Sequence, residues 1–163
     1  AAATAFYGVA LAAPAPTTEP PIVSPDLISS ADALRAVQAA LAACAAKGLP
    51  ATAVVTDADG WERVRLSDDK AVSIGIGSAS RKVATVLNFK QSTADLAARA
   101  AADKAFSDQY AKDDRYYFSP GGFPLFRGGK FVGVLAVGGA RTTDAECAQA
   151  GIKTLAWAST TPR

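Results

Sequence analysis

Two pairs of strand-forming segments are each joined by a short turn, and this feature constrains the fold most. The later pair is "PLFR" (124–127) and "KFVGVLAVGG" (130–139), separated by Gly128-Gly129, a two-residue loop of the primed hairpin type. The earlier pair is "ATAVVT" (51–56) and "WERVRL" (61–66), separated by the turn "DADG". Because a tight hairpin pairs its strands in opposite directions, the chain predicts an antiparallel sheet and not a Rossmann alternation.

Four helical segments accompany these hairpins. The first is predicted from Ser29 or Ser30 to the Gly48 and Pro50 stop signals, the second from about Ser78 to Phe89, the third from Ser92 towards Tyr110, and the last after the capping box that begins at Thr143. Each carries an apolar stripe at helical spacing, which must be buried on the sheet. The order of elements therefore predicts an α+β domain of two or three layers.

Length and composition bound the domain organisation. A chain of 163 residues, half of them apolar, suits one domain with one substantial core. We expect an extended, proline-rich arm over residues 1–26, the domain over 27–158 and a short tail over 159–163. The apolar, alanine-rich run at 1–13 is too short to span a bilayer and is typical of the region around a signal-peptide cleavage site, which predicts a periplasmic or secreted protein. The alternative is an N-terminal arm that docks on the domain or on a neighbouring subunit.

Charge and residue usage exclude several function classes. The net charge is +2 and both signs are mixed along the chain, which argues against nucleic acid or an anionic membrane as the main partner. The chain has no histidine, which removes His-dependent nucleophilic catalysis, His-ligated metal and His-ligated haem. No metal site is predicted, because Asp57 and Asp59 fit turn chemistry better than a calcium loop. The two cysteines, Cys44 and Cys147, form either a disulfide or two buried thiols.

A dense aromatic cluster is the main candidate for ligand binding. Tyr116, Tyr117 and Phe118 follow Arg115 in a predicted loop, and Phe106 and Tyr110 precede them. Such side chains must cover the core, a neighbouring subunit or a flat apolar ligand. A tyrosine phenolate can ligate ferric haem, so in a chain without histidine Tyr116 or Tyr117 is the candidate axial ligand. Arg81, Lys82 and Lys90 are candidates for binding a carboxylate, or form a solvated helix face.

The segment "GGFPLFRGGKFVGVLAVGGARTTDAECAQAGI" (121–152) resembles the signature of the GlcG-like family of haem-binding proteins, which includes secreted HbpS-type proteins and the C-terminal domain of PduO. The matching positions are Gly121, Gly122, Pro124, Gly129, Gly133, Gly139 and Asp144. Upstream, Lys82, Thr85 and Phe89 match the family's Lys-x-x-Thr helix and its following aromatic residue. The similarity covers about residues 27 to 158.

The resemblance implies a profilin-like fold, with the first and last helices on one face of the sheet and the central helices on the other. It also implies a homo-oligomer, a haem or tetrapyrrole ligand, and terminal helices close enough to favour a Cys44–Cys147 disulfide. The sequence departs from the family in three places. Trp61 stands where the family often has histidine, Gly138-Gly139 replaces Ser-Gly, and the loop before Gly121 is longer and more aromatic.

The leading hypothesis is an exported, oligomeric protein that binds haem or another flat aromatic ligand between the loop 110–123 and the helix of Lys82. The predicted ligand-binding residues are Arg81, Lys82, Thr85, Phe89, Arg115, Tyr116, Tyr117 and Phe118. The alternative is a small enzyme acting on an aromatic or hydroxy-acid metabolite. Its acid and base would be Lys82 and either Tyr116 or Tyr117, and fold analogy is its only support.

Overall fold

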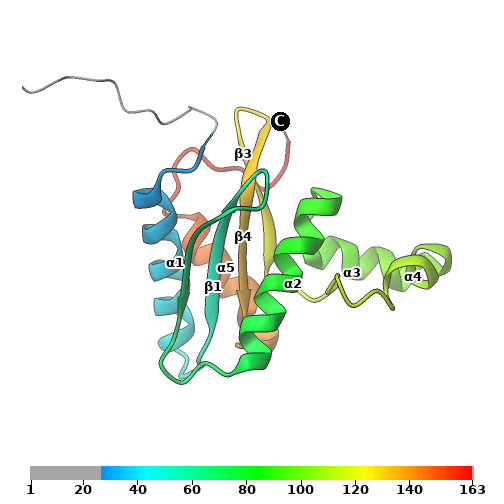
Figure 1. Cartoon of the computed structure of the whole chain (residues 1–163), viewed down its shortest axis with the longest axis horizontal. Helices are drawn as coiled ribbons and strands as arrows, with labels where there is room; N and C mark the ends of the chain where they lie inside the picture. The colour runs from blue at the N-terminus through cyan, green and yellow to red at the C-terminus, as the bar shows by residue number, and fades with distance from the viewer. Residues whose placement is uncertain (1–26, 163) are drawn as a thin grey trace, which may run out of the picture.

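The computed structural model describes residues 27–162, so the predicted arm over residues 1–26 lies outside the described part. The elements are α1 (Ser30–Ala45), β1 (Thr52–Asp57), β2 (Glu62–Ser67), α2 (Ser73–Phe89), α3 (Thr93–Ala102), α4 (Lys104–Tyr110), β3 (Gly122–Arg127), β4 (Lys130–Gly138), the 3-10 helix η1 (Arg141–Thr143) and α5 (Asp144–Ile152). Figure 1 shows the sheet between α1 and α2, with α3 and α4 extending beyond α2. No helix in the described range is both long and apolar enough to cross a membrane.

Both predicted hairpins form, and they join into one four-stranded antiparallel sheet in the order β2-β1-β4-β3. Gly128 and Gly129 have φ angles of 55° and 82°, as the primed turn between β3 and β4 requires. β1 is buried along its whole length because it lies in the middle of the sheet with helices over both faces.

The alternation of side chains along the central strands divides the core in two. Val55 and Leu135 face α1 and α5, whereas Val54 and Val134 face α2. On the first face Cys44 of α1 and Cys147 of α5 are joined by a disulfide, with 5.5 Å between their Cα atoms. The predicted α+β fold, with helices on both faces of an antiparallel sheet, is confirmed.

Two helix boundaries differ from the sequence prediction. α2 begins at Ser73, a turn earlier than predicted from Gly75 and Gly77. A β-carbon at Gly75 would lie 3.0 Å from the Gly139 Cα atom, so close packing against the end of β4 explains this glycine. The predicted helix from Ser92 is broken in two at Asp103, whose carboxylate accepts a hydrogen bond from the Phe106 N–H and caps α4.

The start of α5 and the predicted tail over residues 159–163 also differ from the sequence prediction. The hydroxyl of Thr143 makes no capping hydrogen bond, and α5 is instead preceded by the 3-10 helix η1. The predicted tail begins with a paired residue, because Ser159 exchanges two backbone hydrogen bonds with Phe126 of β3.

Candidate functional site

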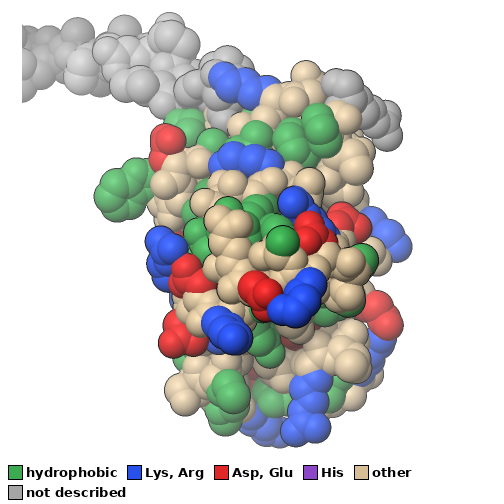
Figure 2. All heavy atoms as spheres, turned by 90° about the vertical axis from the view of Figure 1, so that its right-hand side faces the viewer, with side chains coloured by type: hydrophobic (Ala, Val, Ile, Leu, Met, Phe, Trp, Pro, Cys, Tyr) green, Lys and Arg blue, Asp and Glu red, His purple; other side chains and the backbone are tan. Residues whose placement is uncertain are grey.

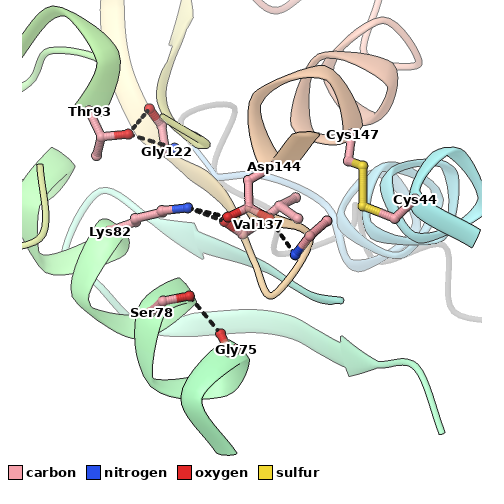
Figure 3. A network of polar contacts seen from close by, with 10 residues as sticks. Cys44, Gly75, Ser78, Lys82, Thr93, Gly122, Val137, Asp144 and Cys147 are labelled. Atoms are coloured by element: carbon pink, nitrogen blue, oxygen red, sulfur yellow. Dashed lines mark hydrogen bonds and ion pairs between the residues drawn. A yellow bond between two sulfur atoms is a disulfide. The ribbon is translucent and has the colours of Figure 1, made fainter. Parts of the chain in front are cut away.

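A buried ion pair lies where α2, the end of β4 and the start of α5 meet. The Lys82 Nζ atom donates to Asp144 Oδ2 at 2.6 Å and to the Val137 carbonyl at 2.9 Å. The other carboxylate oxygen of Asp144 accepts the Ala140 N–H at 2.8 Å. Figure 3 shows the two charged side chains pointing toward each other from α2 and α5. The pair therefore fastens α2 to elements more than fifty residues later in the chain.

Glycine at position 121 makes room for this pair. Its φ angle is +123°, and a β-carbon there would lie 2.6 Å from the Asp144 Cβ atom and 2.9 Å from the Lys82 Nζ atom. The next residue, Gly122, donates its N–H to the Thr93 hydroxyl at 2.9 Å. The start of β3 is thus fitted closely around the ion pair.

Burial changes the protonation equilibria of both partners. Desolvation is the largest effect on Lys82 and lowers its pKa, while the hydrogen bond and charge of Asp144 act in the opposite direction. Desolvation likewise raises the pKa of Asp144, against the effect of Lys82. Since Lys82 is fully buried and hydrogen-bonded, a ligand carboxylate could reach its ammonium group only if the pair opened.

The aromatic residues of the predicted loop pack mainly on one another. The Phe89 ring lies at the centre, with ring centroids at 5.1 to 5.9 Å from it for Phe106, Tyr110, Tyr116 and Phe118. These contacts have edge-on geometry, which aromatic rings favour. Phe89, Phe118 and Tyr116 therefore form a small satellite core that fastens the loop to α2.

Two hydrogen bonds fix the position of the loop on α2. The Arg81 Nη2 atom donates to the Tyr116 carbonyl at 2.6 Å, and the Tyr117 N–H donates to the Thr85 hydroxyl at 2.8 Å. Arg115 instead pairs with Asp113 at 2.6 Å, and this pairing lowers the pKa of Asp113 to about 2. Thr85 and Arg81 thus hold the loop backbone against the helix.

This arrangement places the two candidate tyrosines on different hollows. We call the first the α2 groove: an open depression of about 590 Å³ whose lining includes Arg81, Ala84, Leu87, Asn88, Arg115 and Tyr116. We call the second the Tyr117 cleft: it has about 520 Å³ and its lining includes Leu49, Val72, Ile74, Tyr117, Arg141 and Asp144. The structure therefore brings only part of the predicted set to either hollow.

The Tyr117 cleft combines exposed apolar walls with nearby cations. Val72 and Ile74, at the start of α2, are 60% and 78% exposed, and Tyr117 is 38% exposed. The Arg81 guanidinium carbon and the Lys82 Nζ atom lie 5.0 and 5.8 Å from the centroid of the Tyr117 ring. The cleft can accommodate an apolar ligand of the size range typical of small-molecule sites.

Sequence reasoning missed several residues of this region. The sequence identifies Asp144 only as a position that matches the family signature, although it is the partner of Lys82. Val72 and Ile74 precede the predicted start of the helix, so they were not assigned to its exposed end. Arg141, which lines the cleft, carried one available signal: a basic residue directly after the small residues that end the last strand.

Two observations bear on other kinds of site. Within the described residues, no group of three or more acidic or cysteine side chains is placed to hold a metal ion. Acidic and basic side chains are intermixed on the face that carries α3 and α4, as Figure 2 shows, so that face has no field of one sign.

Comparison with known proteins gives one family and several solved structures. The family model described as "Haem degrading protein HbpS-like" matches residues 28–153. No curated protein matched the chain. Among solved structures, a double mutant of Streptomyces reticuli HbpS is 28% identical, with a TM-score of 0.70 over 89% of this chain and 98% of that one.

A complex of PduOC with haem is 23% identical, with a TM-score of 0.74 over 83% of this chain and 99% of that one. At this identity the likeness shows the fold alone. The family model, by contrast, covers most of the chain, from the start of the first helix to the end of the last. The chain belongs to the HbpS-like family.

Proposed function

We propose that the chain binds haem, or another flat tetrapyrrole, in the Tyr117 cleft, with Tyr117 as the ligand to ferric iron. The observation that carries the proposal is the position of Tyr117: it is a partly exposed phenol in a cleft whose walls include the exposed side chains of Val72 and Ile74. Family membership and the haem complex of PduOC support the ligand class.

The residues present fit this ligand. The chain contains neither histidine nor methionine, and both cysteines are in the disulfide. Of the four side chains that commonly ligate haem iron, tyrosine is therefore the one available among the described residues. Tyr110 and Tyr116 pack in the aromatic cluster around Phe89, which leaves Tyr117 as the candidate ligand. When bound, the haem would supply a redox-active ferric ion in a flat apolar plane.

The rest of the site would hold the ligand rather than react with it. Val72 and Ile74 would cover a macrocycle face and shield it from water, since their side chains are otherwise exposed apolar surface. Thr85 accepts the Tyr117 N–H and so fixes the backbone of the ligating residue. Asp144, which lines the cleft, is held in place by its ion pair with Lys82.

A titration with ferric haem tests the proposal. We expect the wild type to give a shifted Soret band and the charge-transfer absorption of tyrosinate-ligated ferric haem. Tyr117→Phe should lose that absorption, whereas Tyr116→Phe, which alters the neighbouring tyrosine on the α2 groove, should keep it. A spectrum that depends on Tyr116 and not on Tyr117 would move the site to the α2 groove, and no Soret shift in the wild type would refute haem binding.

Export and self-association are part of the same proposal. A disulfide between Cys44 and Cys147 is typical of an oxidising compartment, which supports a periplasmic or secreted protein. Trp61, at the hairpin turn, is 73% exposed. A large aromatic side chain exposed to this extent supports self-association, in which a second copy of the chain would cover it. Cell fractionation tests the first point, and light scattering of the wild type and Trp61→Ala tests the second.

A second candidate function is acid–base catalysis on an aromatic or hydroxy-acid metabolite by Lys82 and Tyr117. It is favoured by the lowered pKa of Lys82 and by its place 5.8 Å from the Tyr117 ring centroid. Full burial of Lys82 and its two hydrogen bonds make haem binding the better-supported function. Turnover that is lost in Lys82→Met, in a protein that remains folded, would favour the enzyme.

A further inference from the structure

Arg141 has an unusual backbone for its residue type. Its φ angle is +56°, in the left-handed region, where a β-carbon is disfavoured and glycine is the usual residue. It follows the end of β4 and opens the 3-10 helix η1, next to the site where Asp144 meets Lys82. Backbone strain of this kind is concentrated at functional and ligand-binding positions, so the backbone angle of Arg141 indicates a functional role for its side chain.

The side chain of Arg141 has the properties of an unengaged cation. It is exposed and lines the Tyr117 cleft. Within the described residues its guanidinium makes no hydrogen bond, ion pair or ring contact. The cations predicted from sequence to bind a ligand are all engaged elsewhere: Lys82 by Asp144, Arg81 by the Tyr116 carbonyl, Lys90 by the Leu87 carbonyl, and Arg115 by Asp113.

We propose that Arg141 recognises a carboxylate of the ligand and so sets the ligand class of the cleft: a flat apolar body with a peripheral carboxylate. The inference rests on the proposed function, which assigns the flat body to Tyr117, Val72 and Ile74. A guanidinium offers paired N–H donors that match a carboxylate, which a single ammonium group does not. The carboxylate of Asp144 is already taken by Lys82 and Ala140, so it does not compete for Arg141.

The test compares ferric haem with ferric haem dimethyl ester, which keeps the macrocycle and removes both negative charges. Affinities of both probes are measured for the wild type, Arg141→Gly, Arg141→Lys and Arg115→Ala. Arg141→Gly removes the cation and suits the left-handed backbone, so the variant should fold at least as well as the wild type. Arg115→Ala is the matched control, because it removes an arginine from the α2 groove.

We expect Arg141→Gly to weaken haem binding about tenfold or more at low ionic strength, the loss typical of a charge-assisted hydrogen bond. The ester should bind the wild type and Arg141→Gly equally, and Arg141→Lys should be intermediate for haem. Arg115→Ala should match the wild type with both probes.

The outcomes separate this inference from the proposed function. Haem that binds the wild type and Arg141→Gly equally overturns the role of Arg141 and leaves the haem site standing. A loss in Arg141→Gly that is the same for haem and for its ester also overturns it, because the side chain would then act by shape. A wild type that binds neither probe overturns both.

Discussion

Replacing Lys82 with methionine should be among the most destabilising single changes in this domain. The side chain is fully buried, and methionine has a similar length without the charge. The substitution leaves the Asp144 carboxylate buried, with the Ala140 N–H as its remaining hydrogen-bond donor. Removing one partner is costly because it leaves the other charge buried without compensation, whereas replacing both partners of a buried pair with apolar residues is often neutral.

The expected cost is about 3–5 kcal/mol, the range measured when one partner of a buried ion pair is removed. For a domain of this size the melting temperature should fall by roughly 10–20 °C. The matched control is Lys47→Met, since Lys47 and Glu146 form an exposed pair with side chains 46% and 66% accessible. That substitution should cost less than about 1 kcal/mol.

The cost of Lys82→Met should also depend on pH. Without the ammonium group, burial raises the pKa of Asp144 further above its unfolded value. A carboxyl group with a raised folded-state pKa contributes stability below its unfolded pKa and loses it as pH rises through the folded pKa. The deficit relative to the wild type should therefore be larger at about pH 8 than at about pH 5.

Urea unfolding followed by tryptophan fluorescence measures these free energies in wild type and variants. A cost below about 1 kcal/mol for Lys82→Met at neutral pH, or a deficit that shrinks as the pH rises, would refute the reasoning.

Three further predictions concern stability and titration. Gly121→Ala should destabilise the fold by more than about 2 kcal/mol, because the β-carbon of the new alanine would overlap the ion pair. The control is Gly77→Ala in α2, which should be neutral or stabilising because a β-carbon there has open space around it. Equal unfolding midpoints for the two variants would contradict this prediction. Replacing both cysteines with alanine removes the disulfide, whose cysteines are 103 residues apart in the sequence, and should lower the free energy of unfolding by about 4–5 kcal/mol. A loss below about 1 kcal/mol would contradict this prediction. The pKa of Asp113 is lowered to about 2, first by the side chain of Arg115 and then by its backbone N–H, so its stabilising contribution should be present above its ordinary pKa and lost as pH falls through about 2. Carboxyl NMR should show a higher pKa for Asp113 in Arg115→Ala, which removes the side chain and keeps the N–H, and an unchanged pKa would contradict this.

Local patterns were enough to predict the framework of the fold. The Gly128-Gly129 turn fixes the second hairpin, and the alternation of the strands fixes which side chains face each helix layer. The helices were placed because their apolar stripes and stop signals are encoded in adjacent residues. The break at Asp103 was missed since a continuous helix and two capped helices share the same local propensities.

The candidate site was only partly predictable, because its contacts join residues far apart in the sequence. Lys82 and Asp144 are sixty-two positions apart, and only the packing of α2 on the end of β4 brings them together. The aromatic residues of the loop were identified from composition, but which tyrosine faces which hollow depends on the hydrogen bonds of Thr85 and Arg81. Arg141 stands out only once its backbone angle is known.

The proposed function requires the ligand to occupy the Tyr117 cleft. Methyl NMR of protein labelled at Ile, Leu and Val side chains tests it most directly, since ferric haem is paramagnetic and broadens nearby resonances. Ile74 and Val72 line the cleft, and Leu87 lines the α2 groove on the same helix. We predict that one equivalent of ferric haem broadens the methyl signals of Ile74 and Val72 more than that of Leu87. Stronger broadening of Leu87, or equal broadening of all three, would contradict the account.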